Sequence, residues 1–248
     1  MSVAEFRAAA EKLRPFTEYI YLHVMGEPLL HPELEKLLGV CESLGFRVSL
    51  TTNGTLLSER AALLVSSPAM YRISVSLHSF EVNEEKTTLE KYISSVCETA
   101  LTARENGILF SMRLWNEGGS NEKNGEIKRL IEAYFPPPHK ENARGITLAS
   151  GVFLEYGEKF EWPDRDGENR PVRFCMGLRD QIAVLCDGTV VPCCLDADGE
   201  IPLGNIFTEE LSSLVASERA QALLRGFSEG HAVEKLCKTC GFAEKRFN

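Results

Sequence analysis

Four cysteines near the C-terminal end of the chain have the spacing of a metal-binding set. Cys237 and Cys240 form a Cys-x-x-Cys knuckle, and Cys175 and Cys193 flank a predicted hairpin whose turn is Asp187-Gly188. The N-terminus has no signal-peptide pattern. In a chain without secretion signals, such a set indicates a metal or iron–sulfur centre more often than disulfides. We therefore expect these four thiolates to bind one centre.

The other four cysteines are expected to be packing thiols. Cys41 and Cys97 fall on the apolar stripes of predicted helices, which is typical of buried thiols. If the hairpin turn has two residues, Cys186 lies opposite Thr189 on the second strand. Cys193 is four residues farther along that strand, so it lies about 13 Å from Cys186 at about 3.3 Å per residue. That separation is too large for one centre. Cys194 follows Cys193 directly and therefore points to the opposite face of the strand.

Two turn motifs in the N-terminal half each follow a predicted strand. Met25-Gly26-Glu27-Pro28 follows the first strand, and Thr51-Thr52-Asn53-Gly54 ends the second. In parallel α/β domains, ligands bind at the C-terminal ends of the strands. Glycine in such a turn lets the backbone approach a ligand closely. We expect Glu27 and Asn53 to lie side by side at this edge.

Strand-like and helix-like segments alternate along the first part of the chain. The helical segments have apolar residues at i, i+3, i+4 and i+7, and the strand-like segments are rich in β-branched and aromatic residues. This alternation predicts a parallel sheet, either doubly wound or a partial barrel. The predicted strands are 19–24, 46–51, 71–77, 108–114 and 146–153, and the predicted helices are 34–44, 57–65, 89–100 and 125–134.

The pattern changes after about residue 157. Turn-rich sequence, the hairpin and one last predicted helix at 208–227 follow, which predicts domains at 1–157 and 158–248. At the other end, Ser2-Val3-Ala4-Glu5 is a capping box, so the chain is expected to open on a helix.

Composition is that of a globular protein. The 248 residues are 44% hydrophobic and 25% charged, and the net charge is −9. This net charge argues against an extended nucleic-acid surface, because phosphate binding needs clustered lysine and arginine. No apolar run is long enough to span a bilayer, so we expect a cytoplasmic protein without a membrane partner.

The segment 21–30, followed by 51–55, resembles the second and third strands of radical S-adenosylmethionine (radical SAM) enzymes. In that family a Gly-Gly-Glu-Pro turn contacts the amino group of S-adenosylmethionine, and here Met25 replaces the first glycine. By strand position, Ser76 and Arg113 resemble the polar residues that contact the ribose or the carboxylate of this cofactor. The resemblance thus implies S-adenosylmethionine as cofactor, bound by Gly26, Glu27, Pro28, Asn53, Ser76 and Arg113.

The C-terminal part resembles the twitch form of the SPASM-type auxiliary domain. The shared features are Gly188-x4-Cys193, the segment Leu203-Gly204-Asn205-Ile206, a helix and then the knuckle. The resemblance implies one auxiliary [4Fe–4S] cluster, held by Cys175, Cys193, Cys237 and Cys240. With four protein thiolates such a cluster has no open iron, so its expected role is electron transfer. Zinc also accepts four thiolates, and spacing alone separates the two poorly.

The Cys-x3-Cys-x2-Cys loop that holds the catalytic cluster of the family does not occur in this sequence. No predicted strand precedes the first helix either. We interpret the chain as a partial (β/α) barrel of parallel strands that lacks its first strand, followed by a small twitch-like hairpin and helix domain. A second [4Fe–4S] cluster is then expected only in an N-terminally longer protein. Alone, this chain is expected not to cleave S-adenosylmethionine reductively.

The resemblance implies a function for the intact protein. It would generate a 5′-deoxyadenosyl radical that abstracts hydrogen from a peptide or small metabolite, with a flavodoxin or ferredoxin as reductant. The auxiliary cluster would transfer electrons. Two alternatives stay open, namely a non-catalytic, zinc-stabilised binding protein and a degenerate family member that binds S-adenosylmethionine without radical chemistry. The sequence assigns no catalytic residue.

Overall fold

The computed structural model describes residues 1–83, 87–171 and 175–245. Two compact units make up the chain. One comprises Thr17–Lys159, and the other combines Met1–Phe16 with Phe160–Asn248. The domain boundary at residue 157 remains a prediction; the compact units change two residues later, and the first helix groups with the C-terminal unit.

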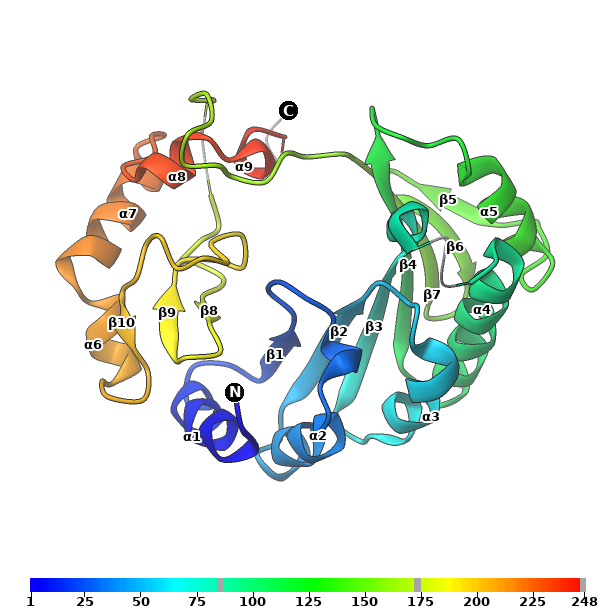
Figure 1. The fold of residues 1–248 in the computed structure, drawn as a ribbon, viewed down its shortest axis with the longest axis horizontal. Helices are drawn as coiled ribbons and strands as arrows, with labels where there is room; N and C mark the ends of the chain where they lie inside the picture. The colour runs from blue at the N-terminus through cyan, green and yellow to red at the C-terminus, as the bar shows by residue number, and fades with distance from the viewer. Residues whose placement is uncertain (84–86, 172–174, 246–248) are drawn as a thin grey trace. The chain divides into compact units, whose positions relative to one another are not determined.

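The unit Thr17–Lys159 is built on a seven-stranded sheet of order β1-β2-β3-β4-β7-β6-β5 (Figure 1). The first five strands in this order are parallel, and β6 and β5 continue the sheet as an antiparallel pair. The strands are β1 Tyr19–Leu22, β2 Arg47–Thr52, β3 Met70–Ser76, β4 Leu109–Glu117, β5 Lys140–Asn142, β6 Gly145–Ala149 and β7 Val152–Glu158.

Helices connect the parallel strands and lie along one side of the sheet (Figure 1). The connections from β1 to β2, from β2 to β3 and from β3 to β4 are strand–helix–strand units, the pattern that the sequence predicts, whereas the connection from β4 to β7 contains α5 and the antiparallel pair β5–β6. The helices of this unit are η1 Pro28–Leu30, α2 Leu34–Ser43, α3 Leu57–Ser66, η2 Leu77–Asn83, α4 Leu89–Glu105 and α5 Asn124–Glu132.

The two faces of this sheet differ in chemistry. Side chains alternate between the faces, so one face collects the fully buried apolar residues that meet the helices; they include Val48, Leu50, Ile73, Val75, Phe110, Met112 and Leu154. Residues paired across neighbouring strands lie on the same face. The pairs Ser49–Arg72, Ser74–Ser111, Ser76–Arg113 and Arg113–Glu155 show that the second face is mainly polar, although Leu109 and Phe153 also lie on it. We call this second face the polar face.

The other unit contains a small antiparallel sheet and short helices. Its sheet has the order β10-β9-β8. Helix α1 opens the chain with the expected capping box, in which Ser2 and Glu5 bond each other's backbone amides. Ala9 of α1 belongs to the apolar core of this unit. The elements are α1 Val3–Leu13, β8 Ala183–Val184, β9 Thr189–Val191, β10 Gly204–Asn205, α6 Leu211–Val215, α7 Glu218–Ser228, α8 Lys235–Lys238 and α9 Gly241–Lys245.

The fold class is confirmed: a mostly parallel α/β sheet is followed by a small antiparallel sheet with helices. Three local predictions were wrong. The strand 146–153 is two strands, because Gly151 takes a positive φ of 78° and turns the chain back on itself. The helix 208–227 breaks at Ser217, whose side chain caps α7. The hairpin loop has three residues, because Leu185 and not Cys186 bonds Thr189.

Among the described residues, the helices are too short or too polar to cross a lipid bilayer.

Gly54 tests the packing at the end of β2. It has a φ of +81°, and an added Cβ would lie 2.8 Å from Val75 Cγ1 and 3.0 Å from the Tyr92 ring. We expect Gly54→Ala to lower the free energy of unfolding by about 1–3 kcal/mol, through backbone strain and overpacking. Gly39→Ala is the control, since Gly39 lies in α2 with open space around it and should gain up to about 1 kcal/mol. Urea unfolding measures both, and equal effects would contradict the predicted close packing.

Candidate functional site

Glu27 joins the C-terminal ends of β1 and β2. Its Oε1 accepts hydrogen bonds from Thr52 Oγ1 at 2.7 Å and from the Leu29 amide at 3.0 Å, and its Oε2 accepts one from the Asn53 amide at 2.7 Å. The expected placement of Glu27 beside Asn53 is therefore confirmed. Three donors already use the carboxylate, and the neighbouring Gly26 is exposed, with no atom within 4 Å of the position that a Cβ would take.

The backbone of Asn53 is also held by a hydrogen bond from α4. Its carbonyl accepts a hydrogen bond of 2.7 Å from the Tyr92 hydroxyl. Burial raises the pKa of Tyr92, so this hydroxyl stays a donor. The Asn53 side chain accepts bonds from the amide and hydroxyl of Thr55 at 2.9 and 2.7 Å. The β2 turn is thus held rigidly next to the β1 turn.

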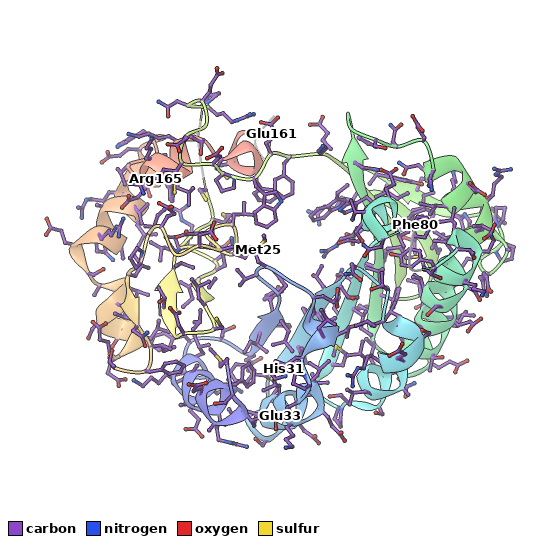
Figure 2. The ribbon with its side chains drawn as sticks, viewed as in Figure 1. Met25, His31, Glu33, Phe80, Glu161 and Arg165 are labelled. Carbon is purple, nitrogen blue, oxygen red and sulfur yellow. The ribbon has the colours of Figure 1, made fainter. Side chains whose placement is uncertain are left out.

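Exposed apolar side chains occur beside these turns. Met25, labelled in Figure 2, is 68% exposed in the turn after β1, and Leu30 is equally exposed. Val82, in η2 after β3, is 85% exposed. Pro28 begins η1 and is partly buried. The loops at this edge of the sheet therefore present the exposed Gly26 together with apolar groups.

Ser76 and Arg113 are register partners on β3 and β4. The Ser79 hydroxyl bonds the Ser76 carbonyl at 2.6 Å and so ties the start of η2 to the strand end. The Arg113 guanidinium lies over the Trp115 ring, 4.7 Å from its centroid, and its Nε is 3.5 Å from Glu155 Oε2. Both residues lie on the polar face.

Arg113 belongs to a charged cluster. Arg72 Nη1 donates to Ser111 Oγ at 2.8 Å and lies 3.5 Å from Glu155 Oε1, and Ser111 Oγ donates to the same oxygen at 2.9 Å. We call Arg72, Ser111, Arg113 and Glu155 the arginine cluster. Its arginine and glutamate side chains are 20–29% exposed, so they are largely shielded from water.

Two histidines, which follow β1 and β3, were not assigned a function from the sequence. His23, after β1, has a buried Nδ1 with no hydrogen-bond partner among the described residues, and burial, together with the charge of Arg113, lowers its pKa. His78 Nδ1 lies 3.2 Å from the Arg113 carbonyl, and burial lowers the pKa of this ring as well. Both imidazoles are therefore neutral near pH 7. The rings of His23 and Tyr21 meet edge to face.

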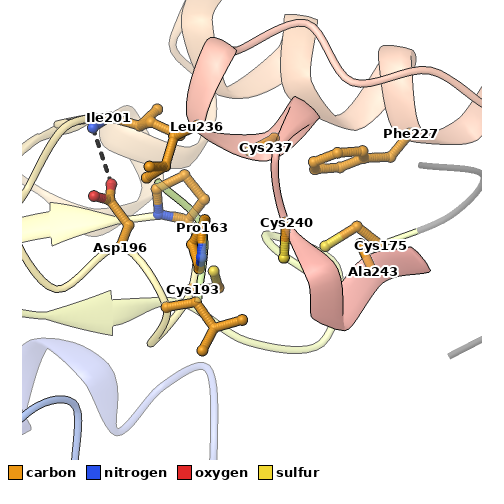
Figure 3. Close-up of a pocket in the computed structure, with 12 residues that line it drawn as sticks. Pro163, Cys175, Cys193, Asp196, Ile201, Phe227, Leu236, Cys237, Cys240 and Ala243 are labelled. Carbon is orange, nitrogen blue, oxygen red and sulfur yellow. Dashed lines mark hydrogen bonds between the residues drawn. The ribbon is translucent and has the colours of Figure 1, made fainter. Parts of the chain in front are cut away.

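A second candidate site lies in the C-terminal unit. One pocket of about 370 Å³, counted with the space that opens to solvent, is lined by all four predicted ligands (Figure 3). Cys175 precedes the small sheet, Cys193 follows β9, and the knuckle lies on and just after α8. The other lining residues are Pro163, Pro192, Leu195, Asp196, Ile201, Phe227, Leu236 and Ala243.

Backbone amides point at several of these sulfurs. The Gly177 amide donates to Cys175 Sγ at 3.4 Å, and the Leu195 amide bonds the Cys193 sulfur. The Phe242 and Ala243 amides bond the sulfur of Cys240. Amide donors of this kind stabilise thiolates and tune iron–sulfur clusters. Without a bound cation, burial dominates and raises the pKa of Cys193 to about 12.

The described side chains do not already form a group of three or more ligands around a single metal ion. The donor set itself, four sulfurs around one largely apolar pocket with amide donors, fits an iron–sulfur cluster. None of Cys41, Cys97 and Cys186 lines the pocket. Cys41 and Cys97 are buried in helices as expected, but Cys186 is exposed in the hairpin loop, so the prediction that it is a packing thiol was wrong. Cys194 is partly buried and also lies outside the lining.

Asp196 is a pocket residue that the sequence did not indicate. It is only 2% exposed, and its carboxylate accepts bonds from the Glu200 amide at 2.8 Å and the Ile201 amide at 2.9 Å (Figure 3). Burial raises its pKa. These bonds close the loop between Asp196 and Ile201, so the side chain shapes the wall of the pocket.

Two family models match this chain. Residues 1–132 match the family model described as the radical SAM superfamily, and residues 175–241 match SPASM, described as an iron–sulfur cluster-binding domain. No curated protein gives a significant sequence match. The four cysteines of the pocket lie within the second match, and both turn motifs lie within the first.

Solved structures share the fold at low sequence identity. BtrN in complex with AdoMet and 2-DOIA has a TM-score of 0.55 and 20% identity, and the match covers 97% of this chain and 80% of that one. Native anSMEcpe with bound AdoMet has a TM-score of 0.62 and 14% identity, with 100% and 83% covered. Streptococcus suis SuiB bound to precursor peptide SuiA has a TM-score of 0.54 and 16% identity, with 98% and 64% covered.

Glu27→Gln tests the bridge between the two strand ends. The amide replaces one acceptor oxygen by a donor, so at least one of the buried donors loses its partner. We expect the free energy of unfolding to fall by about 1–3 kcal/mol. Glu33→Gln is the matched control, because Glu33 forms only an exposed ion pair with Lys36 and should unfold like the parent chain. Urea unfolding of both variants gives the comparison, and indistinguishable curves would show that Glu27 does not join the strands.

Proposed function

The chain belongs to the radical SAM superfamily, and on that premise we propose that it is the scaffold of an enzyme that starts radical chemistry on S-adenosylmethionine. The observation that carries the proposal is the pair of turns joined by Glu27 at the C-terminal edge of the sheet. This edge is where parallel α/β domains bind ligands. Bound together with a catalytic cluster, the cofactor would supply a 5′-deoxyadenosyl radical.

In this proposal the cofactor meets backbone rather than carboxylate at the first turn. The Glu27 side chain is occupied by its three donors, so it positions the turn, and the peptide groups of Gly26 face the ammonium group. Asn53 and Ser76 lie at the ends of the next two strands, where polar groups can reach the ribose. Pro28 fixes the entry to η1 and limits the freedom of the turn.

The four cysteines of the pocket would hold an auxiliary [4Fe–4S] cluster. Four thiolates complete the coordination of such a cluster, so electron transfer is the chemistry it would supply. The amides that bond the sulfurs of Cys175, Cys193 and Cys240 would offset the negative charge of the thiolates. An electron donor of the flavodoxin or ferredoxin class would serve as partner.

The substrate is proposed to be a peptide or a small metabolite. SuiB shares the fold and is seen with a precursor peptide, and BtrN is seen with 2-DOIA, so one scaffold accommodates both kinds of molecule. The loops at the sheet edge support this proposal, because they expose apolar side chains at Met25, Leu30 and Val82 beside polar groups.

Metal analysis tests the auxiliary centre. After anaerobic reconstitution, we expect about four irons per chain and a brown colour, and Cys237→Ala/Cys240→Ala should lose most of the iron because half of the ligands are gone. Cys186→Ala is the control and should retain the cluster, since this thiol is exposed in the hairpin loop. Zinc in place of iron, or full iron retention in the double variant, would contradict the assignment.

A further inference from the structure

Arg219 connects three segments of the C-terminal unit that surround the cysteine pocket. It is the second residue of α7, its Nε donates to Glu234 Oε1 at 2.6 Å, and its Nη1 donates to the Pro202 carbonyl at 3.1 Å. Glu234 is the N-cap residue of α8, and Pro202 directly follows Ile201, which lines the pocket. One side chain therefore ties α7 to the start of α8 and to the loop before β10.

The loop that ends at Pro202 forms part of the pocket wall. Asp196 and Ile201 both line the pocket, and the hydrogen bonds from the Glu200 and Ile201 amides to the Asp196 carboxylate close this loop on itself (Figure 3). Arg219 holds the same loop at its other end, through the Pro202 carbonyl. This wall is thus fixed at both ends.

The knuckle forms another part of the wall, and Arg219 holds it as well. Leu236 and Cys237 of α8 line the pocket, and the Lys238 amide bonds the Glu234 carbonyl at 3.2 Å. Glu234 therefore begins the turn that carries Cys237. The Arg219 and Glu234 side chains are 40% and 24% exposed, so their hydrogen bond is partly shielded from water. Residues that orient metal ligands in this way commonly change metal affinity by about 10–100-fold.

The two charges of this pair act on the pocket with opposite sign. The hydrogen bond to Glu234 raises the pKa of Arg219, and the charges of Asp196 and Cys237 raise it further, so the guanidinium stays charged. Burial and then the other three cysteines of the pocket raise the pKa of the Cys237 thiol, and the charge of Glu234 adds to this rise. A cluster gains one negative charge when it is reduced, so a nearby cation favours reduction and a nearby anion opposes it.

We propose that Arg219 is a positioning residue of the auxiliary cluster, with Glu234 as its partner, and that Arg219 raises the reduction potential of the cluster whereas Glu234 lowers it. The inference rests on the proposed function, because it concerns the cluster that the four cysteines would hold. It deepens that function by naming two side chains outside the ligand set that fix the knuckle and tune electron transfer.

Titration of the anaerobically reconstituted chain with dithionite, followed by EPR spectroscopy of the reduced cluster, measures the reduction potential. Arg219→Gln should shift the potential to a more negative value, because the variant loses the cation and leaves the Glu234 carboxylate unpaired. Glu234→Gln should shift it to a more positive value, because the charge of Arg219 is then unopposed. Both variants break the same hydrogen bond, so a merely structural role would not give shifts of opposite sign.

The rate of iron loss to EDTA measures the positioning. Arg219→Gln and Glu234→Gln should each lose iron about tenfold faster than the parent chain, because both release the start of α8 from α7. Arg219→Lys keeps the charge but lacks the planar fork that reaches Glu234 and Pro202 together. Its potential should therefore stay close to that of the parent chain, while its iron is still lost faster.

Arg225→Gln is the matched control. Arg225 is an exposed residue of the same helix, and its loss changes the net charge of the chain by the same amount as Arg219→Gln. Its potential and its rate of iron loss should equal those of the parent chain. Circular dichroism verifies that each variant is folded, and if Arg219→Gln does not fold, the Arg219→Lys and Glu234→Gln variants carry the test.

Three results would overturn the inference. They are a potential of Arg219→Gln equal to that of the Arg225 control, shifts of the Arg219 and Glu234 variants in the same direction, and parental rates of iron loss in both. Failure of the proposed function is distinguishable, because the parent chain itself then takes up zinc in place of iron. In that case the rate of zinc loss to EDTA from the same variants still tests the positioning role of Arg219.

Discussion

The alternation of side chains across one parallel sheet is the constraint on which the candidate cofactor site depends. A strand can bury apolar groups against helices on one face only if its other residues point away, and here those residues are Ser49, Arg72, Ser74, Ser111, Arg113 and Glu155. The apolar face stabilises the fold, and the polar face carries the residues of the proposed cofactor site. Glu27 then joins the ends of β1 and β2, so that the two turns are held next to each other at the edge of the sheet.

The C-terminal unit has only a small sheet and a small apolar core to stabilise it. Its sheet has three short strands, and its apolar core combines short helices with Ala9 of the first helix. Small units of this kind commonly depend on metal or disulfide cross-links. The four-cysteine pocket, with backbone amides directed at its sulfurs, is consistent with a bound cluster that also links segments far apart in the sequence.

Much of this fold could be predicted because its signals are local. Helical periodicity, the capping box of Ser2 and the strand-ending turns each depend on a few neighbouring residues. The failures were also local: Ser150-Gly151 is a hairpin signal inside a β-rich run, and Ser217 is a helix cap inside a helical run. Both motifs were overlooked in favour of the longer pattern around them.

Some residues of the candidate sites could be predicted from the sequence, and others could not. The cysteines and the Gly26 turn follow from spacing and from resemblance, because their chemistry is tied to short motifs. The arginine cluster could not be found in this way, since Arg72, Ser111 and Glu155 are far apart in sequence and meet only through strand order. His78 was missed for the same reason, because its orientation is set by the backbone of β4.

The central claim is that the cofactor binds at the sheet edge and that a separate, fully ligated cluster binds in the cysteine pocket. Mössbauer spectroscopy of the iron-57-reconstituted chain, with and without S-adenosylmethionine, tests it most directly. The account predicts one [4Fe–4S] cluster whose iron sites all remain sulfur-ligated and unchanged when the cofactor is added. A distinct iron site that appears with S-adenosylmethionine would contradict it, because the cofactor would then bind the cluster that four cysteines are proposed to complete.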